Sequence, residues 1–326
     1  MLWIRKPEDG KMPREDYNIF MAMSQRIGQD SKGNSVFVLD GNGNSTGVLN
    51  HDLNEIADAY IDFLSGNEHQ KSEYIFTIKK SEVKDHININ PQHYSPKLNA
   101  ALDSVLAFDN TDNWATTTVG QLEAGIRIYI GPRWNSASIK VDNPTDISNL
   151  VPYLTANAAL ELRRFTVKWL DARTANPQQR QCIDMLKIHE GDILISRSGT
   201  IGKVTYATKD LAENYIVSDD LVRIRVKDAN LRAYLLAYFT SSTALALMLL
   251  DEYGSVQQHL QPRHIQEMLI PVPDDWSLAQ DMIDAGNMFI KAMEDMSKAD
   301  RKIRTQGFDA LIAEYLYNDQ AKGDQP

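Results

Sequence analysis

The sequence predicts an α+β protein: one domain of mixed sheet and helices, a long coiled-coil-type helix after it, and a small N-terminal hairpin-helix segment. Three observations support this fold class. Short apolar runs alternate with Gly, Pro, Asn and Asp clusters and with helical patterns in the middle of the chain. A heptad pattern follows near the C-terminus, and an Asn/Gly turn lies between two apolar runs near the N-terminus. We therefore divide the chain into residues 1–70, 71–275, 276–316 and a disordered tail, 317–326.

The first section, residues 1–70, contains the hairpin and one helix. "VFVLDGNGNSTGVL" places two apolar runs around an Asn/Gly turn, and "HDLNEIADAYIDFLSG" has apolar residues at helical spacing with Gly66 at its end. The turn resembles a calcium loop at Asp40. An EF-hand, however, requires Gly and Glu where this chain has Ser45 and His51, so calcium binding is excluded.

The second section, residues 71–275, is rich in predicted strands. "LRAYLLAYFTSSTALALMLLDEYG" is apolar at helical periods, which indicates two short helices or one bent helix. Strand pairing across such helices favours a compact α+β domain. The predicted strands are Tyr74–Ile78, Ile126–Ile130, Phe165–Trp169, Asp192–Ser196, Gly202–Tyr206 and Leu221–Val226.

The third section, residues 276–316, carries a heptad seam of nearly four repeats, typical of a helix of roughly 60 Å. A single apolar stripe requires a partner, so the helix either folds back onto its own domain or pairs with another helix in trans. The residues that we expect to bind a partner are Leu278, Met282, Phe289, Met293, Met296 and Ile303.

Composition excludes several classes of protein. No apolar run reaches the roughly 18 residues of a membrane span, and "MLWIRKPEDG" lacks the apolar core of a signal peptide. One cysteine, Cys182, permits neither an internal disulfide nor a cysteine-based zinc site, so we expect a cytoplasmic protein. The net charge of −10 argues against a generic polyanion binder. Residues 111–275 hold 17 Lys and Arg against 19 Asp and Glu, which makes the middle section the least acidic.

The stretch "GDILISRSGTIGKV" (residues 191–204) is rich in groups that could act in catalysis, yet it fits no catalytic motif. A P-loop requires Ser or Thr after Gly202-Lys203, where this chain has Val204. A nucleophile elbow requires glycine two residues on either side of Ser198, where Ser196 and Thr200 stand. We expect a strand that enters a glycine turn and leaves along 204–206.

A series of stretches resembles the target recognition domain of type I restriction-modification specificity subunits. "LVPYLTANAALELRRF" precedes "GDILISRSGTIGKV", and "YIVSDDLVRIRV", "YLLAYFTSS" and "YGSVQQHLQPRHIQEMLIPVP" follow in that order. Upstream, "ININPQHYSPKLNAALDS" is similar to the way such domains begin, and the heptad helix is similar to the family's helical spacer. The resemblance covers roughly residues 85–316. It implies a non-catalytic subunit in which "GDILIS" belongs to the domain framework.

Residues 17–65 resemble a different protein, the C-terminal part of type I adenine methylation subunits. The Asn/Asp-Pro-Pro-Phe/Tyr motif of such methyltransferases is missing, because Asn90-Pro91, Asn143-Pro144 and Asn176-Pro177 are followed by Gln, Thr and Gln. The chain is therefore expected to need no cofactor itself, with S-adenosylmethionine held by a methyltransferase partner. The alternative is that this chain is the C-terminal portion of a split or fused adenine methyltransferase polypeptide.

The resemblance also implies an assembly. Specificity subunits usually have two recognition domains, whereas one "GDILIS" and one "IPVP" occur here, which implies a half-subunit that dimerises through the heptad helix. Such a dimer would recognise a palindromic, interrupted site. The implied partners are double-stranded DNA and an adenine-specific DNA methyltransferase subunit, with a translocating restriction subunit left open. A third hypothesis is a defence-related scaffold that has lost DNA recognition.

Candidate DNA-contacting residues are those whose side chains can bond base edges or phosphates: Arg and Lys, with Asn and Gln for adenine. They occur in "IGPRWNSASIK", in "LRRFTVKW", in the stretch 191–204 and in "GSVQQHLQPRH"; an ordinary solvated surface is the alternative for each. The histidines lack a consistent ligand spacing, so no metal site is expected. The candidates are Arg133, Asn135, Lys140, Arg164, Lys168, Arg197, Lys203, Gln257, Gln258 and Arg263.

Overall fold

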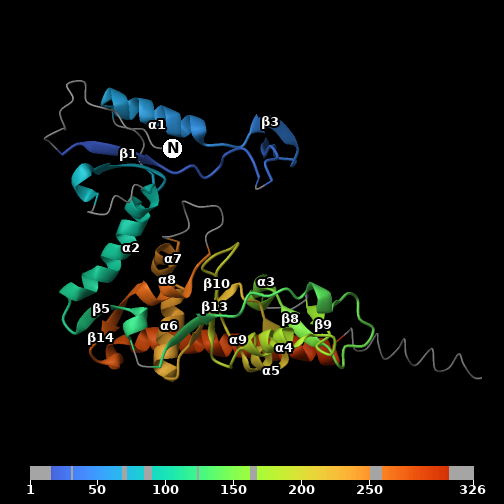
Figure 1. Cartoon of the computed structure of the whole chain (residues 1–326). Coiled ribbons are helices and arrows are strands. Elements are labelled where there is room, and N and C mark those ends of the chain that lie inside the picture. The colour runs from blue at the N-terminus through green and yellow to red at the C-terminus, as the bar shows by residue number, and fades with distance from the viewer. Residues whose placement is uncertain are drawn as a thin grey trace, which may run out of the picture. The chain divides into compact units, whose positions relative to one another are not determined.

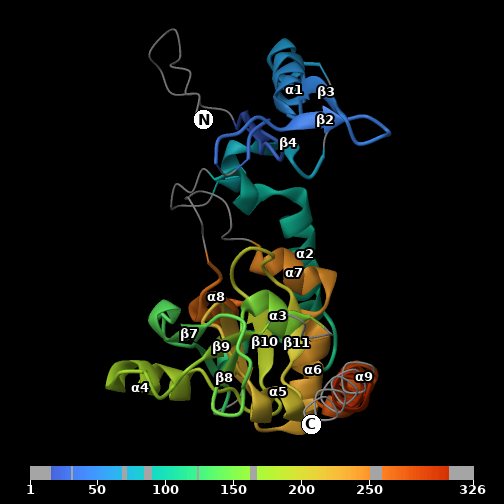
Figure 2. The ribbon, with the colours of Figure 1, turned by 90° about the vertical axis from the view of Figure 1, so that its right-hand side faces the viewer.

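A computed structural model describes residues 16–30, 32–67, 72–83, 90–122, 125–161, 167–249 and 259–307 (Figures 1 and 2). The chain divides into two compact units, Met1–Ala101 and Leu102–Pro326. Helix α2 (Pro96–Leu106) contains the boundary. Each unit is described by itself.

The first unit contains the hairpin and the helix that the sequence predicts. Strands β2 (Phe37–Leu39) and β3 (Ser45–Leu49) pair antiparallel, and α1 (Leu53–Ser65) ends at Gly66, whose φ of 72° is left-handed. Glycine adopts this conformation without steric cost, which explains why the helix ends there.

A second strand pair completes the first unit. Strand β1 (Asn18–Ala22) pairs antiparallel with β4 (Ile75–Lys79), and α1 packs on β1. The Phe20 ring lies 5.3 Å from the ring of Tyr60. The strand expected at 74–78 in the second section therefore lies in the first unit, although the predicted domain bounds otherwise remain predictions. Two short 3-10 helices, η1 (Lys80–Glu82) and η2 (Pro91–Tyr94), follow.

The central sheet of the second unit has four antiparallel strands in the order β11-β10-β13-β6. Strand β10 is fully buried because it lies between β11 and β13. All four of these strands lie within the predicted ranges. Their bounds are β6 (Arg127–Ile130), β10 (Ile193–Ser196), β11 (Val204–Tyr206) and β13 (Leu221–Arg225).

A second four-stranded sheet has the order β12-β8-β9-β7, and β5 pairs with β14 in a separate antiparallel ribbon. Most of these strands were not predicted from the sequence, because several have only two to four residues and show no alternation of apolar and polar side chains. Their bounds are β5 (Trp114–Thr118), β7 (Lys140–Val141), β8 (Val151–Leu154), β9 (Lys168–Leu170), β12 (Ile216–Val217) and β14 (Leu269–Pro273).

Short helices connect these strands, and most begin at a side-chain cap. The predicted pair of short helices is confirmed: Ser241 caps α7 directly after α6 ends. The helices are α3 (Ala156–Leu160), α4 (Pro177–Met185), α5 (Lys209–Asn214), α6 (Ala229–Phe239), α7 (Ser242–Met248), α8 (Pro262–Glu267) and α9 (Gln280–Gln306). The 3-10 turns are η3 (Ala107–Asn110), η4 (Val119–Gln121), η5 (Ala137–Ile139) and η6 (Trp276–Ala279).

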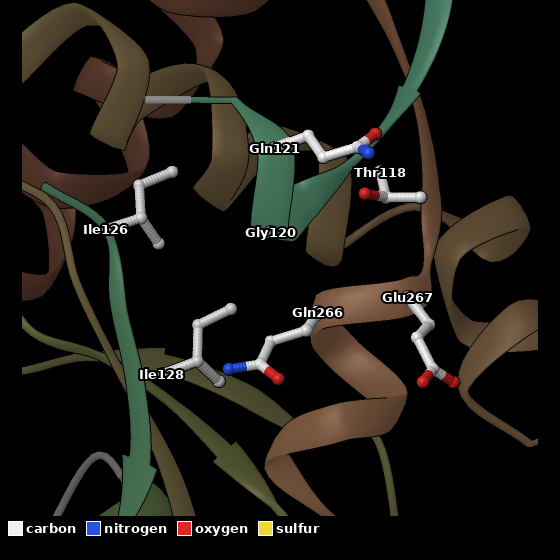
Figure 3. Close-up of a pocket in the computed structure, with 7 residues that line it drawn as sticks. All are labelled: Thr118, Gly120, Gln121, Ile126, Ile128, Gln266 and Glu267. Atoms are coloured by element: carbon white, nitrogen blue, oxygen red, sulfur yellow. The ribbon is translucent and has the colours of Figure 1, made fainter. Parts of the chain in front are cut away.

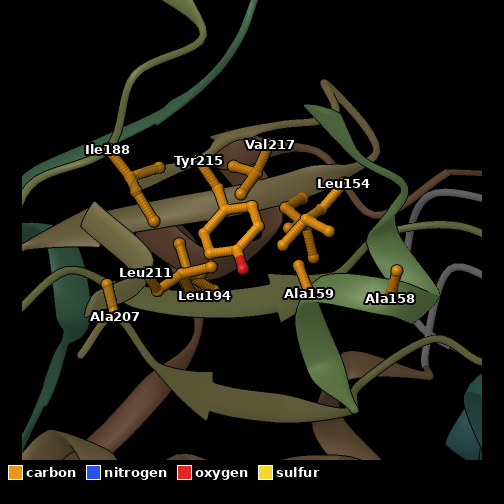
Figure 4. Packing of buried hydrophobic residues seen from close by; sticks show 10 residues of the cluster. Leu154, Ala158, Ala159, Ile188, Leu194, Ala207, Leu211, Tyr215 and Val217 are labelled. Carbon is orange, nitrogen blue, oxygen red and sulfur yellow. The ribbon is translucent and has the colours of Figure 1, made fainter. Parts of the chain in front are cut away.

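The hydrophobic core of the second unit joins the two four-stranded sheets. Leu154 of β8, Leu194 of β10 and Val217 of β12 are fully buried together with Leu211 of α5 (Figure 4). Apolar residues from strands and short helices thus cover the same cluster, which confirms the predicted mixed α+β class.

Helix α9 is shorter than the sequence predicts. The expected helix spans 276–316, whereas α9 has 27 residues, about 40 Å. Residues 276–279 form η6 instead, because the Asp275 side chain accepts the Ser277 N–H and starts a tighter turn. Gly307 has a non-helical conformation, and residues 308–316 lie outside the described ranges.

Helix α9 packs along α6 of its own domain, but not through the predicted seam (Figure 1). Its buried positions are Ile283, Gly286, Ser297 and Asp300. A methyl group at Gly286 would lie 2.0 Å from the Ala233 carbonyl oxygen, so the two helices approach too closely for any side chain there. The helix therefore folds back onto its own domain, which was one of the two predicted alternatives. It packs through the face with Ile283 and Gly286, and not through the predicted heptad seam.

Among the described residues, no helix combines the length and the apolar character that a membrane span requires.

Candidate nucleic-acid interface

The loop after β6 presents three of the predicted DNA-contacting residues. Arg133, Asn135 and Lys140 are exposed, whereas Ile139 is buried and Trp134 packs on Tyr153 with ring centroids 6.4 Å apart. The apolar side chains fix the loop to the domain, so the polar side chains between them face solvent. This is the geometry that contact with a polar ligand requires.

Gly131 sets the base of this loop. A Cβ atom here would lie 2.8 Å from Nη2 of Arg223 and 2.7 Å from the Leu186 side chain. The loop therefore begins by passing directly over Arg223.

Lys168 is less accessible than predicted. It pairs with Tyr153 in the β8–β9 register, and its Nζ lies 5.9 Å from the centre of the Tyr153 ring. Opposite residues share a sheet face, so Lys168 lies on the face of buried Leu170 and is itself half-buried. Lys168 therefore does not lie on an open sheet face, and Arg164, the other candidate in this stretch, lies outside the described residues.

Arg197 is buried, which an exposed phosphate-contacting residue would not be, so its contact with DNA stays a prediction that the structure does not support. Its side chain is 9% exposed. The guanidinium donates to the carbonyl oxygens of Leu260 (3.3 Å) and Asp219 (3.5 Å), while its own carbonyl accepts the Leu260 N–H. Arg197 is used to hold three chain segments together.

Stretch 191–204 is a strand, a glycine turn and a returning strand, as predicted. Gly199 and Gly202 have φ values of 68° and 81°, and a Cβ at Gly202 would lie 2.5 Å from the Leu245 side chain. Lys203, unlike Arg197, is exposed. Arg263 is also exposed, with its Nε 3.2 Å from Nε2 of His264. Gln257 and Gln258 lie outside the described residues.

Asp192, Arg225 and Tyr129 form a buried polar network, which was not predicted from the sequence. Asp192, 1% exposed, accepts two hydrogen bonds from Arg225 (2.8 and 2.9 Å) and one from the Tyr129 hydroxyl (3.3 Å). Burial, together with the charge of Asp192, raises the pKa of Tyr129. These groups are mutually satisfied, which indicates a structural and not a catalytic role.

Arg223 is fully buried and donates to several backbone carbonyls. Its Nη1 lies 3.1 Å from the Met185 oxygen and 3.4 Å from that of Lys187, and its Nη2 lies 3.0 Å from the Val217 oxygen. Arg223 therefore fixes the end of α4 beneath the start of the 131–140 loop. The signal in the sequence was the alternation in "LVRIRV", where a charged residue occupies an inward-facing position.

The local charge favours an anionic ligand. Residues 131–187 hold eight Lys and Arg against five Asp and Glu, a balance of +3 in a chain of net charge −10. Lys140 is paired with Asp142 at 2.5 Å, but both are exposed, and such a pair is weak enough to open for a phosphate.

A pocket of about 400 Å³ lies between η4, β6 and α8 (Figure 3). Its walls combine Ile126 and Ile128 with the amides of Gln121 and Gln266 and the carboxylate of Glu267. Its lining contains no histidine, cysteine or serine. Over the described ranges, no three His, Cys, Asp or Glu side chains are grouped so as to hold a metal ion.

The predicted partner-binding stripe of η6 and α9 lies beside the face that packs on α6, and most of it is exposed. Leu278 and Ile303 are each 50% exposed, and Met282 and Met296 are each 41% exposed. Phe289 and Met293 are half-buried. The stripe therefore remains accessible after α9 has packed on its own domain.

Comparison with known proteins finds a family model that matches the central part of the chain. Residues 132–283 match the family model of the type I restriction modification DNA specificity domain. The match does not extend to residues 17–65, whose resemblance to methylation subunits stays a prediction. Among curated proteins, none matches this chain.

Several solved structures are similar to the chain. The HsdS subunit from Thermoanaerobacter tengcongensis is 15% identical, with 64% of this chain and 47% of that chain covered and a TM-score of 0.37. The type I restriction-modification S subunit from M. genitalium is 10% identical, with 64% and 46% covered and a TM-score of 0.36. A structure of type I R-M system assembly is 15% identical, with 91% and 83% covered and a TM-score of 0.36.

The chain spans about half the length of the two S subunits. TM-scores of this size do not establish a shared overall fold, so the assignment rests on the sequence match. Residues 132–283 of this chain are similar to the type I restriction modification DNA specificity domain.

Proposed function

We propose that this protein recognises a specific sequence in double-stranded DNA and positions an adenine-specific DNA methyltransferase partner there. The specificity-domain match over residues 132–283 is the observation that carries this proposal. The exposed Arg133, Asn135 and Lys140 support it, because such side chains can contact phosphates and base edges, and they lie in a segment, residues 131–187, of net charge +3.

Methyl transfer, under this proposal, occurs in the partner. The partner would hold S-adenosylmethionine, and the described part of this chain contributes framework and DNA contacts. A cytoplasmic location and assembly with a translocating restriction subunit belong to the same proposal.

Two copies of the chain would pair through α9. The stripe from Leu278 to Ile303 supports this step, because most of its apolar side chains stay exposed although neighbouring positions of the helix are buried on α6. A two-fold dimer would place two recognition domains on a palindromic, interrupted site.

Methylation mapping tests the proposal directly. Long-read sequencing of genomic DNA should show an interrupted adenine-methylated motif that disappears when this gene is deleted and the neighbouring methyltransferase gene is kept. A palindromic motif would support the dimer. An unchanged methylome would contradict the proposed function.

A further inference from the structure

The outer face of α4 carries side chains of the kind that recognise bases, and the sequence analysis did not select it. Gln178 and Gln181 are exposed, and Met185 is 54% exposed. Positions i, i+3 and i+7 of a helix lie on one face, so these three side chains form one stripe about 10 Å long. Ile183, by contrast, is buried and faces the domain.

Two reciprocal hydrogen bonds and a proline fix the start of α4. Asn176 caps the helix by accepting the Gln179 N–H at 2.8 Å, and Gln179 accepts the Asn176 N–H at 3.0 Å in return. Pro177 at the first helical position adds a fixed φ angle. The direction in which α4 leaves its loop is therefore set by local chemistry.

Gln179 also joins α4 to the 131–140 loop. Its amide nitrogen donates to the Ser138 hydroxyl at 2.9 Å and lies 3.4 Å from the Asn135 carbonyl oxygen. At the other end of the helix, Arg223 holds the Met185 carbonyl and lies beneath Gly131. The loop and the helix are thus joined at both ends.

This arrangement separates two roles among neighbouring glutamines. Gln179 is used within the domain, whereas Gln178 and Gln181 are exposed on either side of it. Glutamine forms paired hydrogen bonds with N6 and N7 of adenine, and an apolar side chain contacts the methyl group of thymine. The major groove, about 12 Å wide, accommodates a single helix.

We propose that the outer face of α4 recognises A·T base pairs in the major groove through Gln178 and Gln181, with the 131–140 loop on the adjoining phosphates. The inference rests on the proposed function, since it names the recognition element of that DNA site. The stripe spans about three base-pair steps, so each glutamine addresses its own base pair.

Sequence selection from a random duplex pool tests this inference. The full chain, with any protein that copurifies, is incubated with the pool at a fixed salt concentration, and the bound DNA is sequenced. The variants are Gln178→Ala and Gln181→Ala, and Gln306→Ala serves as the control for an exposed helical glutamine. Each α4 variant should lose discrimination roughly 5- to 150-fold at one or two adjacent base pairs. The remaining motif and the salt dependence should not change, because glutamine carries no charge.

The outcomes separate the two proposals. An unchanged motif in both α4 variants, with a motif selected by the parent protein, overturns α4 as the recognition element and leaves the proposed function intact. An equal loss of affinity for all sequences also overturns it. If the parent protein selects no motif, the proposed function itself fails.

Cys182 provides a second measurement that requires no change to the recognition stripe. It is half-buried on α4 beside Gln181, and it is the one cysteine of the chain. Selected DNA should slow the reaction of Cys182 with a maleimide, whereas a duplex scrambled at the A·T positions should slow it less. Equal rates with both duplexes would contradict recognition by α4.

Discussion

Two loops of the second unit contain similar residues and use them in opposite ways. Residues 197–203 contain an Arg, a Lys and two glycines, and residues 131–140 contain an Arg, a Lys and an Asn. In the first loop Arg197 is buried and bonded to carbonyl oxygens. In the second, Trp134 and Ile139 make the anchoring contacts, so Arg133 and Asn135 are left to solvent.

The difference teaches which loops can bind a ligand. A loop fixed by its apolar residues keeps its polar groups available, whereas a loop fixed by its polar groups has already used them. Residue type alone does not distinguish the two cases. The position of the buried apolar anchors, which the structure provides, does distinguish them.

The largest effect expected concerns the residue beneath the exposed loop. Arg223→Met leaves the carbonyls of Met185, Lys187 and Val217 without their donor, and it should lower the free energy of unfolding by about 3–5 kcal/mol. Urea denaturation measures the change. Arg127→Met, an exposed arginine over the Tyr129 ring, should cost less than about 1 kcal/mol. Equal losses for the two variants would contradict the role of Arg223.

Arg197 and Lys203 allow the stability contributions of a buried and an exposed cation to be compared within one loop, residues 197–203. Arg197→Ala should lower stability by about 1–3 kcal/mol, because the guanidinium bonds to Leu260 and Asp219 are lost. Lys203→Ala should change stability by less than about 0.5 kcal/mol, since Lys203 is exposed. DNA titrations at several salt concentrations extend the comparison.

If Lys203 contacts a phosphate, its variant should lower the slope of log affinity against log salt by about 1. A slope change of that size for Arg197→Ala, with no loss of stability, would reverse our assignment of the two residues.

Gly286→Ala tests the packing face of α9. The added methyl would lie 2.0 Å from the Ala233 carbonyl, so α9 must shift away from α6, and stability should fall by about 1–3 kcal/mol. Asn287→Ala, one exposed position further along, should be neutral or slightly stabilising because alanine favours helix. A neutral Gly286→Ala would show that α9 does not pack closely on α6.

The sequence predicted the fold class and most central strands, because alternation and turn residues are local signals. It missed the short strands β7, β8 and β12, which depend on pairing partners far away in the chain. It predicted one apolar face of α9 and missed the other, since Ser297 and Asp300 interrupt the buried stripe. For the candidate site it selected Arg133 and Lys140 by type, but burial of Arg197 depends on tertiary contacts that no local pattern reports.

The exposed face of α9 should affect assembly more than stability. The double variant Met282→Gln, Met296→Gln should change the free energy of unfolding of a dilute sample by less than about 1 kcal/mol, because both side chains are 41% exposed. Sedimentation or light scattering should then show a shift from dimer to monomer at concentrations where the parent protein is dimeric. Glu294, which bonds the Lys209 N–H on the buried side, is left in place as the contact that keeps α9 on its domain.

Asp219 should give the smallest effect, and its sign can be derived. Partial burial, with the adjacent charge of Asp220, raises the pKa of Asp219. The protonated form is therefore favoured in the folded state, so its contribution is complete below about pH 4 and is lost as the pH rises through the raised pKa. Asp219→Asn removes this dependence, and the variant should gain stability relative to the parent protein between acidic and neutral pH. Urea midpoints measured from pH 3.5 to 7 would show the gain, and parallel curves would contradict it.

Because Arg133 interacts with the Asp219 charge, the same variant should also bind DNA slightly more tightly near neutral pH if Arg133 contacts a phosphate. The Asp219 carboxylate would then lower the affinity of Arg133 for a phosphate. The backbone carbonyl of Asp219 has a separate role, because it accepts a hydrogen bond from Arg197.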